Sequence, residues 1–162
     1  MKSSFLSISV AALSLVLFTA GPVTAQNTSA VEQAVKAVAA EAKRAWAAHD
    51  LDACMAVYDT QPSGLLIWGG KAHSLQSMRA RLQEIWTERT TEAWTHDSLQ
   101  VIVLSDTSAL LQITWSGRFT RTNGQTWEYK SNSFSTWLLQ KRGNAWKIVA
   151  EHGSASGTQV KK

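Results

Sequence analysis

The sequence is poor in cysteine: Cys54 is the only one in 162 residues. The chain therefore has no internal disulfide, and its stability must come from the packing of side chains. Cys54 has apolar neighbours in the segment from Asp50 to Tyr58 and no adjacent base. We expect a buried, unreactive thiol in preference to a nucleophile.

The sequence also lacks any concentration of positive charge. Its 16 basic and 12 acidic residues give a net charge of +4, but the basic residues are scattered along the chain. A nucleic-acid groove needs a basic stripe on one face, so we expect no nucleic-acid partner. The four histidines lack the spacing of metal ligands, and the sequence predicts no metal site and no cofactor.

The first residues have the pattern of a bacterial signal peptide. Lys2 precedes an apolar run over residues 5–20, and small side chains follow up to Ala25. This pattern predicts cleavage after Ala25 and an exported protein, either periplasmic or secreted. An uncleaved membrane anchor is less favoured, because a bilayer span takes about 20 apolar residues. We expect no membrane contact after cleavage.

The mature part is predicted to be a single domain over residues 26–154 with a flexible tail at 155–162. Apolar residues at helical spacing predict three helices, over residues 29–48, 50–58 and 74–89. Ser29 is the expected capping-box residue of the first, while Asp50 and Ser74 are the expected caps of the others. A short buried strand is predicted at residues 65–68.

From Trp94 onward the apolar period changes to two, which predicts four strands. Asn123-Gly124 is the strongest hairpin signal, because both residues tolerate the positive φ of a type I′ turn. The order α-α-β-α-β-β-β-β predicts an α+β domain with three N-terminal helices on a curved, mostly antiparallel sheet. Strict alternation on the last strand places four residues on the inward face: Trp146, Ile148, Ala150 and His152.

Two segments resemble the nuclear transport factor 2-like superfamily, and within it the SnoaL-like and ketosteroid isomerase-like proteins. Residues 45–58, AWAAHDLDACMAVY, are similar to the family's first helix turning into its second. Residues 137–154, WLLQKRGNAWKIVAEHGS, are similar to its final hairpin. The resemblance implies a cone-like fold with a deep pocket and a homodimer formed through the sheet. Neither segment is a catalytic motif, and fold alone does not determine function.

The resemblance also implies where an isomerase of this family would carry its catalytic groups. Such enzymes have a carboxylate base on the first strand and a tyrosine on the first helix. The matching positions here are the apolar stretch 65–68 and a residue near Ala42. We therefore expect no ketosteroid isomerase activity.

The eight tryptophans indicate an aromatic pocket for a small apolar or aromatic molecule. The residues expected to contact this ligand are Tyr58, Trp68, Trp86 and Trp115, although core packing is the commoner role of any one tryptophan. A binding domain is the favoured function. The alternative is an isomerase, dehydratase (lyase) or hydrolase on an apolar substrate, and a purely structural domain is a third reading.

The catalytic residues in the enzyme hypothesis are His152, as the proton carrier, and Asp59, with Tyr58 assisting. A histidine at the end of an inward-facing row lies at the mouth of a pocket. A core histidine bonded to backbone is the plainer interpretation of His152. For Asp59 the plainer interpretation is a turn residue.

Overall fold

The structure is a computed structural model that describes residues 25–162 except 63, 156, 161 and 162. The predicted signal peptide, residues 1–25, lies outside the described residues apart from Ala25. No helix in the described part of the chain is both long and apolar enough to cross a membrane.

Three helices form one layer in the part of the chain that the structure describes, as the apolar spacing predicts. They are α1 (Ala25–Ala47), α2 (Leu51–Ala56) and α3 (Leu75–Glu88). Asp50 caps α2 by accepting a hydrogen bond from the backbone N–H of Ala53, and Ser74 caps α3 in a capping box with Ser77. These two predictions are confirmed. The predicted capping box at Ser29 is wrong, because α1 already begins at Ala25 and Ser29 lies inside it.

The helix α1 ends through backbone geometry at His49. His49 has a φ of 54°, and its N–H donates to the carbonyl of Trp46 while the N–H of Asp50 donates to that of Ala45. These two backbone hydrogen bonds form a Schellman motif, in which the residue with positive φ is usually glycine. It turns the chain sharply into α2.

Within the described residues, seven strands form the second layer. They are β1 (Leu66–Trp68), β2 (Lys71–His73), β3 (Arg89–Ser105), β4 (Ser108–Arg121), β5 (Thr126–Arg142), β6 (Ala145–Ser154) and β7 (Gly157–Val160). The order across the sheet is β2-β1-β6-β5-β4-β3, and β7 pairs with β5. All pairs are antiparallel except β1 with β6.

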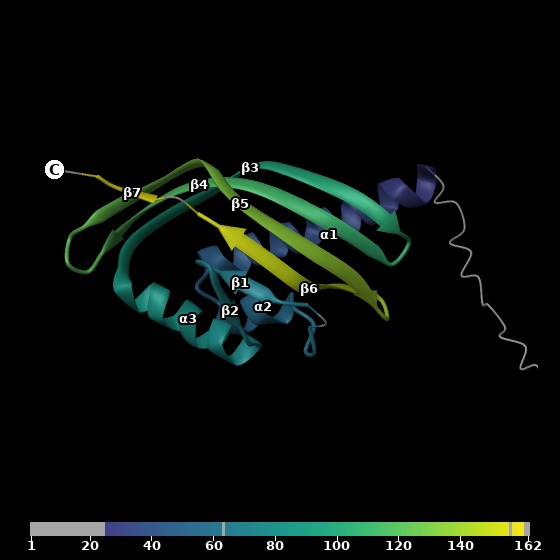
Figure 1. The fold of residues 1–162 in the computed structure, drawn as a ribbon, viewed down its shortest axis with the longest axis horizontal. Coiled ribbons are helices and arrows are strands. Elements are labelled where there is room, and N and C mark those ends of the chain that lie inside the picture. Colours follow the sequence, from purple (N-terminus) through teal and green to yellow (C-terminus); the bar gives the residue numbers. More distant parts are fainter. Residues whose placement is uncertain (1–24, 63, 156, 161–162) are drawn as a thin grey trace, which may run out of the picture.

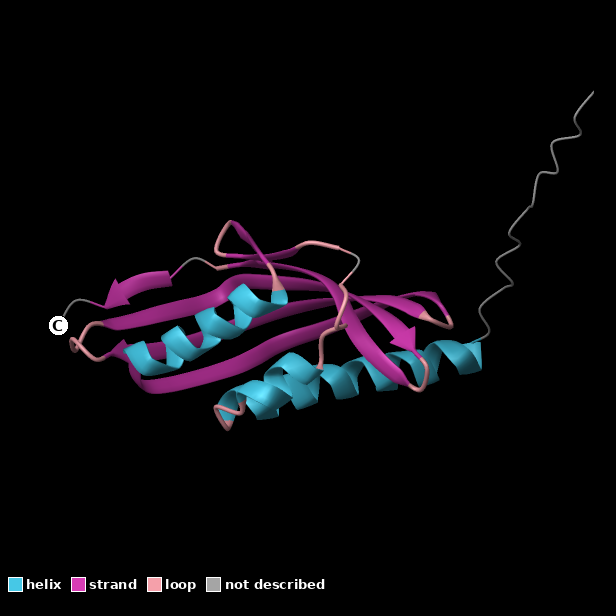
Figure 2. Ribbon diagram, turned by 90° about the horizontal axis from the view of Figure 1, so that it is seen from below, coloured by secondary structure: helices cyan, strands magenta, loops and turns pink. Residues whose placement is uncertain are grey.

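The sheet curves over the helices, which lie on its concave face (Figure 1). Seen from below, α1 and α3 run across the same face of the strands (Figure 2). The core lies between these layers. It joins Val35 and Ala39 of α1 to Leu111, Leu139 and Ile148 of the sheet. This arrangement confirms the predicted α+β cone-like fold.

Three details differ from the sequence-based expectation. Residues 71–73 form an unpredicted strand, β2, and residues 157–160 of the expected flexible tail form β7. The predicted type I′ turn at Asn123-Gly124 is wrong, because only Gly124 has a positive φ. Four residues connect β4 to β5, so the hairpin does not need two consecutive left-handed residues.

Candidate functional site

A cavity of about 870 Å³ lies between the helices and the concave face of the sheet. This volume is within the range of small-molecule sites, roughly 300–1,000 Å³. Seven aromatic residues line it: Trp46, Tyr58, Trp68, Trp94, Trp115, Tyr129 and Trp137. They come from α1, the end of α2, β1 and three strands of the large sheet, so only the folded chain brings them together.

Neighbouring aromatic rings contact one another, some edge to face and others tilted. Trp94 and Trp115 lie with ring centroids 4.9 Å apart at 71°, and Trp46 lies 6.3 Å from Trp94 at 87°. Gly117 makes room for Trp94, because a Cβ at position 117 would lie 2.1 Å from Trp94 Cε3. The rings therefore have fixed positions and form a rigid wall.

Small residues form the floor of the cavity between these rings. Ser135 of β5 and Gly153 of β6 are paired in register and both line the cavity. A Cβ at Gly153 would make only ordinary contacts, the nearest at 3.5 Å. The absence of large side chains at this pair leaves space for a ligand.

Glu151 of β6 is a buried carboxyl group in the cavity wall, with 5% of its surface exposed. Tyr58 donates a hydrogen bond from its hydroxyl to Glu151 Oε2 at 2.5 Å. Burial raises the pKa of Glu151, while hydrogen bonding from Tyr58, Trp68 and Trp137 partly opposes this shift. Burial and the neighbouring Glu151 raise the pKa of Tyr58 well above its ordinary value.

A β-bulge directs Glu151 into the cavity. The register between β5 and β6 shifts between Leu138 and Leu139, which pair with Ala150 and Ile148, so Val149 is the extra residue. A bulge of this kind reverses the alternation of side chains along the strand. Beyond it, Glu151 continues the inward row that Ile148 belongs to.

An ion pair lies at another part of the cavity wall, on β3. Arg89 binds Glu92, and both side chains are largely buried, with 12% and 9% of their surface exposed. Trp46 donates its indole N–H to the same carboxylate. The Arg89 guanidinium also lies 4.0 Å from the ring centroid of Phe119, a cation–π contact.

His96 of β3 lines the same side of the cavity and is half-buried. Burial lowers its pKa, the positive charge of Lys43 lowers it further, and Asp97 partly opposes these effects. The imidazole is therefore neutral at neutral pH and able to accept a proton.

The described residues contain no group of three or more histidine, cysteine, aspartate or glutamate side chains that could hold a metal ion. Cys54 lines the cavity and is buried as expected, and burial raises its pKa to about 11. A thiol with so high a pKa carries almost no thiolate at neutral pH.

Three of the four predicted ligand-binding residues, Tyr58, Trp68 and Trp115, line the cavity. Trp86 does not line it. Its ring stacks on His49 at 5.0 Å and meets Trp46 edge to face at 5.8 Å. Trp86 lies on α3 and packs against the end of α1, where it contacts Trp46 of the cavity wall.

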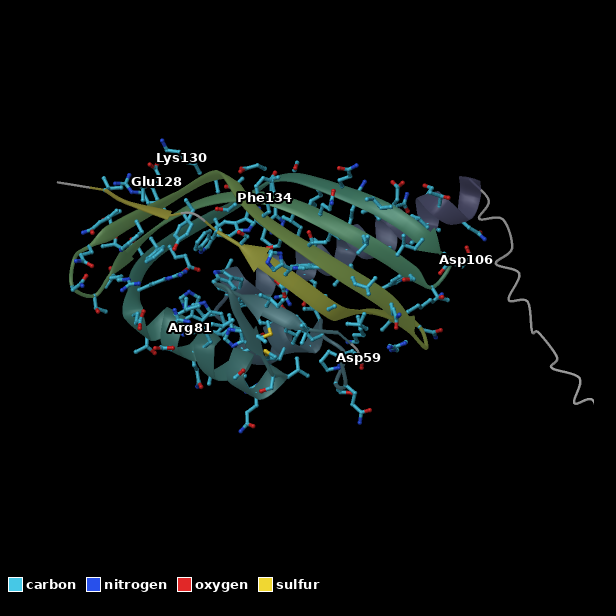
Figure 3. The ribbon with its side chains drawn as sticks, in the orientation of Figure 1. Asp59, Arg81, Asp106, Glu128, Lys130 and Phe134 are labelled. Carbon is cyan, nitrogen blue, oxygen red and sulfur yellow. The ribbon has the colours of Figure 1, made fainter. Side chains whose placement is uncertain are left out.

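The two residues proposed as catalytic lie elsewhere. The expected inward orientation of His152 is wrong: its side chain is exposed and does not line the cavity, because the bulge at Val149 reverses the parity. Asp59 pairs with Arg142 at 2.6 Å and accepts from the backbone N–H of Gln61. In Figure 3 it lies in the loop after α2, apart from the labelled Arg81, which lines the cavity.

Sequence reasoning did not single out four residues that line the cavity: Glu151, His96, Trp46 and Trp137. Ile148, Val149 and Ala150 are three consecutive apolar residues, so the sequence shows no sign of where the alternation breaks. Glu151 also pairs in register with Leu66 of the first strand. β1 itself has no carboxyl group, but Glu151 of the adjacent strand β6 places one beside it.

The SnoaL-like domain family matches residues 35–157 of the chain. The protein belongs to this family. Among proteins with curated descriptions, none matches the sequence.

Solved structures show the same fold. A hexachlorocyclohexane dehydrochlorinase, LinA-type3 from Novosphingobium barchaimii LL02, has a TM-score of 0.72 at 9% identity, over 85% of this chain and 94% of that chain. A protein from Novosphingobium aromaticivorans provisionally named a scytalone dehydratase has a TM-score of 0.74 at 9% identity, over 86% and 93%. A nuclear transport factor 2-like protein from Salmonella enterica serovar Typhimurium LT2 has a TM-score of 0.69 at 16% identity, over 79% and 92%. At these identities the likeness establishes the fold alone.

Proposed function

We propose that this protein binds a small, flat, largely apolar organic molecule in the cavity after export from the cytoplasm. The supporting observation is the aromatic wall, in which five tryptophans and two tyrosines surround a space of about 870 Å³. Burying the faces of an aromatic ligand against such rings gains both apolar area and ring–ring contact. Export rests on the signal-peptide pattern in the sequence.

A titration of tryptophan fluorescence with a panel of uncharged bicyclic and tricyclic aromatic compounds tests the proposal. Ser135→Phe fills the floor of the cavity and should abolish the fluorescence change. Thr136→Phe places the same ring at the next position of β5, on the outer face, and should leave binding intact. If Ser135→Phe and Thr136→Phe both fold and bind the compounds with equal affinity, the ligand site is not in this cavity.

The outer face of the sheet supports a second part of the proposal, a homodimer. Ile102 and Leu104 of β3 and Phe134 of β5 are large apolar side chains exposed on that face, with 39%, 50% and 52% of their surface accessible. Phe134 is labelled in Figure 3. Covering them with a second copy would remove apolar area from water. The molar mass of the wild type and of Phe134→Glu in solution checks this, and a monomeric wild type would contradict it.

A proton-transfer enzyme is the second candidate function. His96 favours it, because a neutral imidazole on the cavity wall can remove a proton from a bound substrate. The structural neighbours whose names denote elimination of hydrogen chloride or water are consistent with such a reaction. In this case His96→Ala should lose turnover while keeping ligand affinity. Unchanged turnover in this variant would exclude His96 as the base.

A further inference from the structure

The charges on the described part of the cavity wall do not balance. The cations that line it are Lys43, Lys71, Arg81 and Arg89, and the carboxyl groups are Glu84, Glu92 and Glu151. Arg81 pairs with Glu84, and Arg89 pairs with Glu92. Burial raises the pKa of Glu151, which favours its uncharged form. Neither lysine belongs to an ion pair within the described residues, so the charge left on the wall is positive.

Lys43 brings one of these charges to the side of the cavity that α1 and β3 form. It lies three residues before Trp46 on α1, so the two side chains share a face of the helix, and both line the cavity. The positive charge of Lys43 also lowers the pKa of His96 on β3. The ammonium group therefore lies on the β3 side of α1, near the His96 ring.

The carboxylates around Lys43 have other partners in the described structure. Glu92, on the same strand as His96, is held by Arg89 and by the indole N–H of Trp46. Asp97, next to His96 in the chain, does not line the cavity and accepts a hydrogen bond from Ser116. Lys43 can thus be paired by an anionic group that enters the cavity with a ligand.

His96 provides a directed hydrogen-bond donor beside this charge. Burial and the charges of Lys43 and Asp97 account for the shifted pKa of His96, and no hydrogen bond contributes to it. A neutral imidazole has one N–H donor. Trp115 pairs in register with His96, and its ring contacts Trp94 edge to face. A ligand ring against these two tryptophans can therefore extend a substituent toward both His96 and Lys43.

We propose that Lys43 and His96 bind the carboxylate group of an aromatic acid whose ring system lies against the tryptophans of the cavity. This subsite rests on the proposed function of the cavity and specifies the chemical class of its ligand. Lys43 is exposed, so the bound carboxylate stays in contact with water and avoids most of the cost of burying a charge. A cationic ligand would meet a like charge at Lys43, and an uncharged one would leave that charge unpaired.

Three naphthalene derivatives of nearly the same shape test this subsite: 2-naphthoate, 2-naphthamide and 2-naphthamidine. At pH 7.5 their substituents are negative, neutral and positive. We expect the wild-type protein to bind the naphthoate about tenfold more tightly than the amide, and the amidine more weakly than either, because Lys43 attracts the first and repels the last. Isothermal titration calorimetry measures the dissociation constants, and added NaCl should narrow the differences between them.

Substitutions of two lysines on α1 separate a local contact from the overall charge of the protein. Lys43→Met keeps the unbranched stem without the ammonium group, so the preference for naphthoate over amide should fall to about twofold or less. Lys43→Arg keeps the charge and should keep the preference. Lys36→Met is the matched control, because Lys36 pairs with Glu32 and does not line the cavity. It should bind like the wild type, and circular dichroism checks that each variant is folded.

Removing the donor tests the second member of the subsite. His96→Phe has a ring but no N–H group, and it should reduce the preference for naphthoate without abolishing it, because Lys43 is still present. A preference for naphthoate in this variant equal to that of the wild type would remove His96 from the subsite.

The failure of the subsite and the failure of the proposed function give different results. Equal affinities for the three compounds, or tightest binding of the amidine, would overturn the subsite and leave ligand binding in the cavity standing. A preference for naphthoate that survives in Lys43→Met, or that Lys36→Met loses to the same extent, would also overturn it, because the charge would then act from elsewhere. If none of the three compounds binds, both the cavity function and the subsite are wrong.

Discussion

The two sides of the cavity bury acidic groups in opposite ways. On β6, Glu151 lies with Tyr58 and two indoles and has no cation, and burial raises its pKa. On β3, Glu92 binds Arg89 and accepts from Trp46. β5 and β4 separate these strands, and the groups also lie at different levels along them: Glu151 pairs with Trp137 of β5, whereas Glu92 is aligned through Phe119 with Trp127, ten residues earlier on β5.

One pocket thus contains both an acid whose pKa is raised by burial and a carboxylate that is paired with a cation. In a buried ion pair, the attraction between the two charges offsets the loss of hydration. An acid without a cation avoids this cost by keeping its proton. The β3 side therefore acts as structural support, with Arg89 stacked on Phe119. On the β6 side, hydrogen-bond donors and not a cation hold Glu151.

Breaking the ion pair should have the largest effect on stability. Arg89→Ala leaves Glu92 buried with only Trp46 as donor and removes the contact with Phe119. We expect the free energy of unfolding to fall by about 3 kcal/mol, measured in urea. The double variant Arg89→Met with Glu92→Leu should recover most of this loss. A loss below about 0.5 kcal/mol for Arg89→Ala would show that the pair is solvated.

Removing the Tyr58 hydroxyl group, on the β6 side of the cavity, should reduce stability less than Arg89→Ala does. Tyr58→Phe removes the hydroxyl that donates to Glu151 in a buried site, for which we expect a loss of about 2 kcal/mol. The pKa of Glu151 should also rise further, because this hydrogen bond lowers it. Tyr129→Phe is the matched control in the same cavity. Its hydroxyl has no hydrogen bond to the described residues, so its stability should stay close to that of the wild type.

The raised pKa of Glu151 should also give a pH dependence of stability. As pH rises past the ordinary pKa of a glutamate, the unfolded chain loses the proton that folded Glu151 keeps. The stability of the wild type therefore falls relative to Glu151→Gln between that pH and the raised folded pKa. The slope is at most about 1.4 kcal/mol for each unit of pH. Urea unfolding of both proteins from pH 4 upward measures it, and parallel curves would mean that Glu151 is ionised.

The smallest effect is expected outside the cavity, at Asp59. The hydrogen bond from Arg142 lowers the pKa of Asp59, so the pair stabilises the fold above the ordinary pKa of an aspartate. This contribution is lost as pH falls through the lowered folded value. Asp59→Asn should change stability only slightly, less so in high salt, and leave ligand affinity unchanged. Loss of binding or turnover in this variant would restore Asp59 as a functional residue.

The helices and the sheet could be predicted because their signals are local. Asp50 and Ser74 cap helices through residues three positions away, and the apolar period identifies α1 and α3 without tertiary information. The tryptophans indicated an aromatic pocket, and Trp68 and Trp115 are on its wall. The predicted inward orientation of His152 is wrong because strict alternation requires regular strand pairing. The bulge at Val149 breaks this pairing and depends on the register with β5.

The sequence by itself determined the order of the elements, the α+β class and an interior rich in tryptophan, because these follow from the spacing of side chains along the chain. Only the tertiary structure decided which side chains face the cavity. Tyr58 and Glu151 are 93 positions apart, and the hydrogen bond between them forms only when β6 bulges and α2 ends beside it. Strand register and burial are properties of the assembled sheet. They place Glu151, and not its neighbour His152, in the cavity wall.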